Sequence, residues 1–147
     1  GHSTVAIDAK GRTNLPRELR RELPSGADGK VVVVPGPSAT LLLFDAPAFE
    51  RMIRSLQSRE RTPELATHIR RLTALAASSE LDEQNRLTLP PRLVEWAALE
   101  NRVTFVGEGD RISLMHPSRF ESEILGEGAT PGFDGFLDTL QVPLEGA

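Results

Sequence analysis

The sequence predicts an α+β fold in which two similar, β-rich halves are joined by helices. Three observations lead to this prediction. Part of the 147-residue chain occurs twice, each copy alternates short apolar runs with turns, and the segment between the copies has helical periodicity. A unit of fewer than fifty residues buries too little surface to be stable alone, so we expect the two copies to pack against each other.

The repeat becomes visible when the chain is aligned with itself. Residues 7–16 match residues 81–90 at an offset of 74, and residues 32–50 match residues 103–121 at an offset of 71. The difference is absorbed by residues 24–29, Pro-Ser-Gly-Ala-Asp-Gly, a turn-forming insertion in the first copy. The predicted organisation is a first half at residues 1–50, a helical connector at 51–76, a second half at 77–121 and an acidic tail with a short docking helix at 122–147.

Each half is expected to begin with two short strands around a tight turn. The turn contains Gly11 in the first half and Asn85 in the second, and Gly and Asn are the residues that best tolerate positive φ. A proline, Pro16 or Pro90, then presets φ for the first turn of a short helix. The four expected strands cover residues 4–7, 12–15, 79–81 and 86–89.

The remainder of each half is predicted to be that helix followed by a β-hairpin. The helix has a buried stripe formed by Leu19 and Leu23 in the first half and by Leu93 and Ala97 in the second. Two β-rich runs around a Gly-containing turn follow in each copy. These runs cover residues 31–34, 40–44, 103–106 and 112–115.

The connector is predicted to form two helices. Asp45 is expected to cap the first helix, with Pro47 in its first turn, and Thr62-Pro63 is expected to begin the second. In the tail, residues 126–132 are loop-like. Beyond them, apolar residues at helical spacing predict the docking helix, namely Phe133, Phe136, Leu137 and Leu140.

Composition excludes several classes of protein. No apolar run approaches the length of a membrane span, so no membrane contact is expected. The chain has no Cys, which excludes disulfides and Cys-based zinc sites. It starts Gly-His-Ser-Thr, without the basic and apolar stretches of a signal peptide, so we expect a cytoplasmic protein and leave His2 out of the functional argument.

The charge is unevenly distributed along the chain. A net charge of −4 argues against a protein that binds nucleic acid by overall charge alone. All 17 basic residues lie at or before Arg119, however, so residues 1–119 carry +2 and residues 120–147 carry −6. Fifteen of the 17 are Arg, whose planar fork of donors suits phosphates and base edges.

The sequence lacks the common enzyme signatures. It contains neither a complete G-x-G-x-x-G nor a Walker A loop, and its three histidines have no metal-ligand spacing. An enzyme that uses Asp8 or Asp82 with a nearby His is disfavoured, because the repeated pair is Asp and Arg rather than an acid and a base with separated pKa values. We therefore expect no catalytic residue, metal, cofactor or small-molecule substrate.

The candidate functional residues belong to a D-x-x-x-R motif that occurs twice. Asp8 and Arg12 precede Leu15-Pro16, and Asp82 and Arg86 precede Leu89-Pro90. Each Asp is predicted where a strand enters a turn, so its carboxylate can accept hydrogen bonds from turn amides or from its own Arg. The Arg then leaves the turn in a fixed direction. The alternative is that each pair is only a salt bridge that orders the turn, which contributes little when exposed.

These motifs resemble those of the MraZ family. The resemblance rests on Asp8-Ala9-Lys10-Gly11-Arg12 and Asp82-Glu83-Gln84-Asn85-Arg86 with their following Leu-Pro pairs, and it covers about residues 1–121. It implies two swapped-hairpin, AbrB/SpoVT-like halves that assemble into closed homo-oligomeric rings. It also implies a nucleoid-associated transcriptional repressor that binds double-stranded DNA at direct repeats in the promoter of its own cell-division and cell-wall gene cluster.

The resemblance also implies which residues contact DNA. Arg12 and Arg86 match the motif arginines, and Asp8 and Asp82 match the motif aspartates. Lys10 matches the basic residue of the turn and Gly11 the turn glycine. Asn85 and Gln84 depart from the usual Gly and basic residue.

The two copies differ in charge around the motif. Residues 8–21 carry +3, whereas the matching residues 82–95 carry −1. We therefore predict that the first half is the main DNA-contacting half, with Arg12 at base edges. The predicted phosphate contacts are Lys10, Arg17, Arg20 and Arg21. A solvated helix face is the alternative for the last three.

A second function remains open from the sequence. The chain could be an antitoxin-like or adaptor module of the same fold, whose acidic tail occupies a protein partner. In that case, removal of residues 122–147 abolishes partner binding and leaves oligomerisation intact.

Overall fold

The computed structural model describes residues 1–24, 29–126 and 132–141. The chain divides into two compact units, Gly1–Pro117 and Ser118–Ala147, which are treated separately below. The predicted insertion at 24–29 and the predicted loop at 126–132 lie largely outside the described residues.

The first unit contains every strand of the described chain, and the predicted strands and helices are present with bounds shifted by one or two residues. The strands of the first half are β1 (His2–Ala6), β2 (Arg12–Asn14), β3 (Lys30–Gly36) and β4 (Thr40–Asp45). Those of the second half are β5 (Ala77–Glu80), β6 (Arg86–Thr88), β7 (Arg102–Gly107) and β8 (Ile112–Met115). The helices of this unit are α1 (Arg17–Glu22), α2 (Ala46–Gln57), α3 (Pro63–Leu75) and α4 (Pro91–Trp96).

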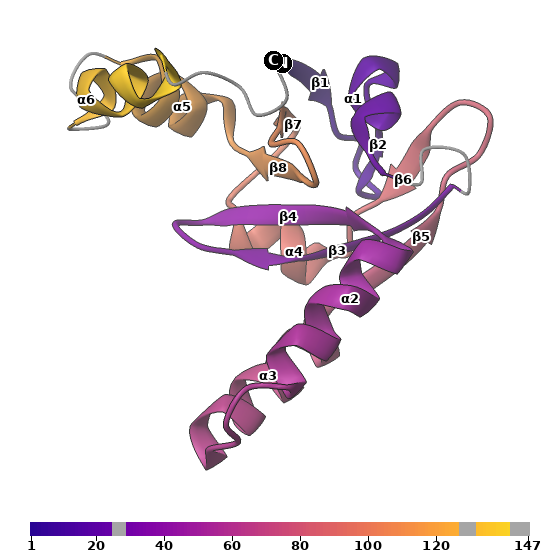
Figure 1. The fold of residues 1–147 in the computed structure, drawn as a ribbon. Coiled ribbons are helices and arrows are strands. Elements are labelled where there is room, and N and C mark those ends of the chain that lie inside the picture. Colours follow the sequence, from indigo (N-terminus) through magenta and orange to yellow (C-terminus); the bar gives the residue numbers. More distant parts are fainter. Residues whose placement is uncertain (25–28, 127–131, 142–147) are drawn as a thin grey trace. The chain divides into compact units, whose positions relative to one another are not determined.

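The two halves exchange strands with each other (Figure 1). Six strands form a sheet in the order β1-β7-β8-β4-β3-β5, and β2 and β6 form a separate two-stranded sheet. The first strand of each half therefore pairs with the other half, β1 with β7 and β5 with β3, both antiparallel. This arrangement agrees with the expectation that neither copy is stable alone.

The main core lies where the halves meet. Leu19 and Leu23 of the first half and Leu93 and Ala97 of the second are all buried in one cluster, as their spacing predicts. A smaller cluster on the other side of the sheet centres on Val32, Val34 and Phe44 and is covered by the start of α2 and the end of α3. This smaller cluster holds the connector helices to the sheet at one end only.

The connector helices begin at the predicted caps. The Asp45 carboxylate accepts a hydrogen bond of 2.8 Å from the backbone N–H of Ala48, and the Thr62 hydroxyl accepts one of 3.0 Å from Leu65. No residue of α2 or α3 is buried. Figure 1 shows both helices extending away from the strands.

The second unit contains the predicted tail helix, but its apolar side chains are not covered in the described chain. The unit comprises most of α5 (Pro117–Phe120), a π-helix (Glu121–Leu125), α6 (Phe133–Asp138) and a 3₁₀ turn (Thr139–Gln141). Phe133, Phe136, Leu137 and Leu140 are 39% to 64% exposed. The predicted helix is therefore present, and the sequence left open whether it packs on its own subunit or on a neighbour. Across both units, none of the described helices is long and apolar enough to cross a membrane.

Candidate nucleic-acid interface

The first D-x-x-x-R turn is organised by the Asp8 carboxylate. Its Oδ1 accepts hydrogen bonds of 2.9 Å from the backbone N–H groups of Lys10 and Arg12. Its Oδ2 accepts a bond of 2.7 Å from Nε of Arg12. The backbone closes the turn, with Gly11 N–H donating to the Asp8 carbonyl at 3.0 Å. The carboxylate thus fixes both the turn and the direction of the Arg12 side chain.

The second turn repeats this geometry. Asp82 Oδ1 accepts from the N–H groups of Gln84 at 2.9 Å and Arg86 at 3.1 Å, and Oδ2 accepts from Nε of Arg86 at 2.8 Å. Asn85 N–H donates to the Asp82 carbonyl at 2.9 Å. The predicted hydrogen bonds from turn amides and from the motif Arg therefore occur in both halves.

The two motif arginines keep donors available to a ligand. Their side chains are 53% exposed for Arg12 and 55% exposed for Arg86. A guanidinium carries five N–H donors, and each Arg uses only one edge of its fork on its own aspartate. Each turn therefore presents an oriented, partly solvated guanidinium, the group best suited to bidentate contact with a phosphate or a guanine edge.

The two turns are joined through β2 and β6. Arg12 pairs with Thr88 and Asn14 with Arg86 in the antiparallel register, so both motif arginines belong to the same two-stranded sheet. Leu15 N–H donates to the Asn85 carbonyl, and Leu89 N–H donates to the Gly11 carbonyl, both at 2.8 Å. The motifs, which lie 74 residues apart in the sequence, form one continuous surface.

Gly11 and Asn85 hold equivalent positions in the turns, and both have positive φ, +80° and +59°. At Gly11 a Cβ would collide with the carbonyl oxygen of Leu89, so only glycine fits. Asn85 is 6% exposed, and its side chain is held by a partner from the other half. Gly11 and Asn85 therefore both have the positive φ that the sequence predicts. Gly11 packs against the backbone of Leu89, whereas the Asn85 side chain accepts a hydrogen bond from the first half.

Arg20 is the partner of Asn85. Its guanidinium donates to Oδ1 of Asn85 and, at 3.4 Å, to the carbonyl of Asp82. Its charge predicts a phosphate contact, and the structure shows that its guanidinium also supports the second turn. The position that matches Arg20 in the second copy is Val94, so no equivalent bond exists at the first turn.

The other predicted phosphate contacts remain exposed. Lys10 lies at the tip of the first turn, and Arg17 and Arg21 lie on α1. None of the three forms an ion pair with another residue that the structure describes. Lys10 adds a positive charge beside Arg12 at the first turn, whereas Arg17 and Arg21 lie on α1, the helix whose Arg20 contacts the second turn.

Asn14 also belongs to this surface, although no motif in the sequence indicates it. Its side-chain amide donates to the carbonyl of Gln84 at 2.8 Å, which ties β2 to the second turn. The matching residue in the second copy is Thr88. The difference between Asn14 and Thr88 is the one feature of the sequence that could have drawn attention to this residue. It is a weak indication, because it does not show that Asn14 contacts Gln84.

The hydrogen bonds lower the pKa of both aspartates from the ordinary value of 3.8. For Asp8, the backbone N–H of Arg12 is the largest cause and the Arg12 side chain the next. For Asp82, the backbone N–H and then the side chain of Arg86 act in the same way. Both carboxyl groups are therefore ionised at neutral pH and act only as acceptors.

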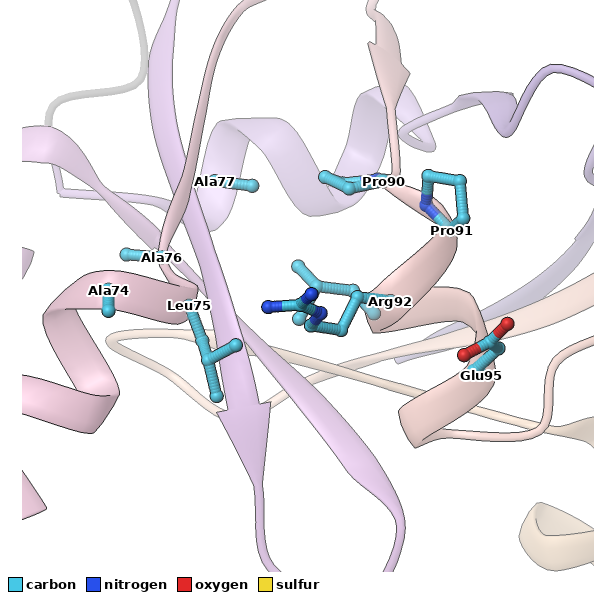
Figure 2. Close-up of a pocket in the computed structure, with 9 residues that line it drawn as sticks. Ala74, Leu75, Ala76, Ala77, Pro90, Pro91, Arg92 and Glu95 are labelled. Carbon is cyan, nitrogen blue, oxygen red and sulfur yellow. The ribbon is translucent and has the colours of Figure 1, made fainter.

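Outside the turns, an open hollow of about 510 Å³ lies between the end of α3 and α4 (Figure 2). Its walls are mostly apolar, from Leu75, Ala76, Ala77, Pro90 and Pro91, and its charged residues are Arg92 and Glu95. Figure 2 shows the Arg92 guanidinium directed across the pocket toward the end of α3. No nucleophile or acid–base pair lines it.

Metal-ligating residues do not cluster in the described chain. Among residues 1–24, 29–126 and 132–141, no group of three or more His, Cys, Asp or Glu side chains could hold a metal ion. The sequence repeat and the hydrogen-bond geometry both indicate the two Asp–Arg turns as the candidate functional site.

Comparison with known proteins gives the family. A family model described as "MraZ protein, putative antitoxin-like" matches residues 1–72 and 72–124. A curated protein of Methylococcus capsulatus named transcriptional regulator MraZ is 33% identical over 141 residues, covering 91% of each chain. Its namesakes from Thioalkalivibrio sulfidiphilus and Salinispora arenicola are 35% and 31% identical, covering 78% and 90% of this chain and 77% and 97% of their own.

The family model matches the chain twice, once over each half that the internal repeat predicts. The relatives extend over most of its length at about one-third identity. The chain therefore belongs to the MraZ family.

Proposed function

We propose that this chain is a DNA-binding transcriptional regulator whose two Asp–Arg turns contact double-stranded DNA. The observation that carries the proposal is the placement of Arg12 and Arg86 on one two-stranded sheet, each half-exposed and oriented by its own aspartate. An isolated surface ion pair would need neither the carboxylate bonds to two turn amides nor a second copy beside it. The names of the relatives support the same role.

In this proposal the first turn makes the stronger contact. Arg12 enters a groove and donates to base edges, and Lys10, Arg17 and Arg21 contact phosphates. Arg20 donates through Nη1 to Asn85 and so also holds the second turn in place. Arg86 makes a weaker contact, because its turn lacks a basic residue at the position of Lys10.

The regulator acts as a ring of identical subunits with AbrB/SpoVT-like, strand-exchanged halves. The pairing of β2 with β6 and of β1 with β7 across the repeats supports such halves. One weak patch per subunit becomes a strong site when several patches bind direct repeats together. We propose that these repeats lie in the promoter of the chain's own cell-division and cell-wall cluster, that binding represses the cluster, and that the protein acts at the nucleoid in the cytoplasm.

A fluorescence anisotropy titration tests this function. The full chain is titrated against labelled duplex DNA carrying direct repeats and against a duplex with the same bases scrambled, each at two salt concentrations. We expect tighter binding to the repeats, and weaker binding as salt rises, because phosphate contacts release counterions. Equal affinity for both duplexes contradicts sequence-specific recognition, and no binding at low salt contradicts DNA binding altogether.

A protein-interaction function is the second candidate. The observation that favours it is the set of exposed apolar side chains in the second unit, which includes Ile124, Leu125, Phe133 and Phe136. An antitoxin-like or adaptor protein would use such a surface for a protein partner. In that case the anisotropy titration shows no DNA binding, whereas variants of these apolar residues lose the partner.

A further inference from the structure

The apolar side chains of α6 and of the 3₁₀ turn that follows it form a docking pattern. Phe133, Phe136, Leu137 and Leu140 are spaced i, i+3, i+4 and i+7, which is how an amphipathic helix anchors in a groove. Each is at least 39% exposed, and the rings of Phe133 and Phe136 stack with centroids 6.1 Å apart. Large apolar side chains this exposed at docking spacing indicate a surface that is covered by a partner.

The same helix carries acidic residues. Asp134 and Asp138 are spaced i, i+4, and neither forms an ion pair with a residue in the described part of the chain. Residues 120–147 carry −6 in total. A partner of α6 is therefore expected to combine an apolar groove with basic residues at its edge.

The connector helices have such a groove. A hollow of about 230 Å³ between the end of α2 and the start of α3 is lined by Leu56, Leu65 and Ile69, with Arg61 and Arg70 among its walls. The three apolar side chains are only half-buried, and neither Arg forms an ion pair within the described residues. Residues 46–75 contain six Arg and three Glu, which gives the helix pair a charge of +3.

We propose that α6 of one subunit docks in this groove of a second copy of the chain. An apolar residue of α6 fills the hollow, and Asp134 and Asp138 face Arg61 and Arg70. The Leu and Ile side chains that line the groove favour an apolar helix as its ligand, because DNA would make no use of an apolar lining. Because the groove and α6 are different surfaces, the contact is heterologous, and repeated heterologous contacts form a ring when the rotation between subunits closes. The inference rests on the proposed oligomer and names the surfaces that build it.

Charge reversal in the full chain tests the proposal. One variant carries Arg61→Glu and Arg70→Glu, and the other carries Asp134→Arg and Asp138→Arg. All four side chains are exposed, so both variants are expected to fold. We expect each variant alone to lose the assembly, seen as a fall in molar mass by light scattering toward that of a single chain. An equimolar mixture regains the mass, because acidic grooves then meet basic helices and basic grooves meet acidic helices.

A matched control separates this contact from a general charge effect. Arg54→Glu with Arg71→Glu changes the same helices by the same charge at exposed residues that do not line the hollow, and the mass is expected to stay unchanged. As an independent measurement, the absence of native Cys allows a chain with Ile69→Cys to be mixed with one carrying Leu137→Cys. Under mild oxidation these chains form a disulfide-linked dimer, whereas Thr67→Cys with Leu137→Cys does not.

Several outcomes overturn the proposal. They are a wild-type chain that is monomeric, a mass unaffected by either reversal, and a mass restored only when all four substitutions share one chain, which indicates docking within a subunit. Loss of DNA binding by Arg61→Glu with Arg70→Glu at unchanged mass would assign the groove arginines to DNA. A chain that assembles as expected but does not bind repeat DNA contradicts the proposed function and leaves the docking contact supported.

Discussion

A single carboxylate organises each turn at the residue scale. Asp8 accepts from two backbone amides and from its own Arg, so replacing it removes three hydrogen bonds at once. An exposed Asp–Arg pair alone would contribute little to stability. The use of both carboxylate oxygens on the turn explains why the spacing of four residues is kept in both copies.

Glycine at position 11 is required for space as well as for conformation. In Gly11→Ala, the added Cβ meets both a positive φ and the carbonyl of Leu89. In Gly109→Ala, φ is also positive, +90°, but no atom lies within 4 Å of the added Cβ. We expect Gly109→Ala to lose about 1–2 kcal/mol of unfolding free energy from strain alone.

Gly11→Ala should lose clearly more unfolding free energy than the control Gly109→Ala, because the clash with Leu89 adds to the backbone strain. Urea unfolding followed by circular dichroism measures both variants. Equal losses would mean that the backbone at Leu89 moves away at no cost, and would contradict the close approach of the two halves at this turn.

The lowered pKa of Asp8 and Asp82 predicts how the turns respond to acid. Both groups are more acidic in the folded chain than their ordinary value of 3.8, so their stabilising contribution is complete above that pH and is lost as the pH falls through the folded pKa. In Arg12→Ala we expect the Asp8 pKa to rise and yet stay below 3.8, because the backbone N–H of residue 12 is its largest cause.

Carboxyl carbon NMR shifts of Asp8 and Asp82 between pH 2 and 6 measure this change, with Asp82 of the same variant as the internal control. If the pKa of Asp8 returns to 3.8 in Arg12→Ala while the pKa of Asp82 is unchanged, the turn amides do not stabilise the Asp8 carboxylate.

At the scale of elements, helix α1 of the first half supports the turn of the second half. The contact joins Arg20 to Asn85, two residues at which the copies differ, since their counterparts are Val94 and Gly11. We expect Arg20→Ala and Asn85→Gly each to destabilise the chain and the double variant to lose little more than either. The coupling energy should be about 1 kcal/mol, which is typical of residues in direct contact.

Thermal or urea unfolding of the three variants completes this double-mutant cycle. Arg17→Ala is the control for removal of an exposed Arg from the same helix, and it should not couple to Asn85→Gly. Additive losses for Arg20 and Asn85 would contradict their contact.

The sequence was sufficient to predict the elements, because each depends on local signals. The Pro before α1 and α4, the Asp45 and Thr62 caps and the positive φ at Gly11 and Asn85 all appear as expected. The Asp–Arg geometry was predictable for the same reason, since its partners lie within five residues.

Contacts between distant residues could not be predicted from these signals. The pairing of β1 with β7 and the bond between Arg20 and Asn85 join residues that are 65 or more positions apart. Arg20 was grouped with Arg17 and Arg21 by charge, and charge alone does not distinguish a side chain that faces DNA from one that faces a turn. Helical spacing likewise predicted α6 without showing what covers it.

At the scale of the whole molecule, strand exchange predicts that the first unit unfolds as one. Trp96, the only Trp of the chain, lies on α4 of the second half, and its indole N–H donates to the Gly36 carbonyl of the first half at 3.1 Å, so its fluorescence reports on the contact between the halves. Leu19→Ala opens a cavity in the shared core from the first half, and it should cost about 2–5 kcal/mol. We expect the Trp96 transition and the circular dichroism transition to shift together in urea.

The control for this test is Leu75→Ala, which removes the same side chain from the half-buried end of α3 and should shift both transitions only slightly. A Trp96 transition that stays at the wild-type position in Leu19→Ala would show that the halves unfold independently, contrary to their exchanged strands.

The proposed function depends on both motif arginines, with Arg12 contributing more. The most direct measurement is the dissociation constant of repeat DNA for Arg12→Ala and Arg86→Ala, measured separately at one salt concentration. Arg119→Ala is the matched control, since Arg119 forms an i, i+4 ion pair with Glu123 outside the turns. We expect Arg12→Ala to weaken binding by about 1–3 kcal/mol, Arg86→Ala to weaken it less, and Arg119→Ala to leave it unchanged. Equal losses at Arg12 and Arg86 would contradict the asymmetry between the halves, and wild-type affinity in both variants would contradict the assignment of the Asp–Arg turns to DNA.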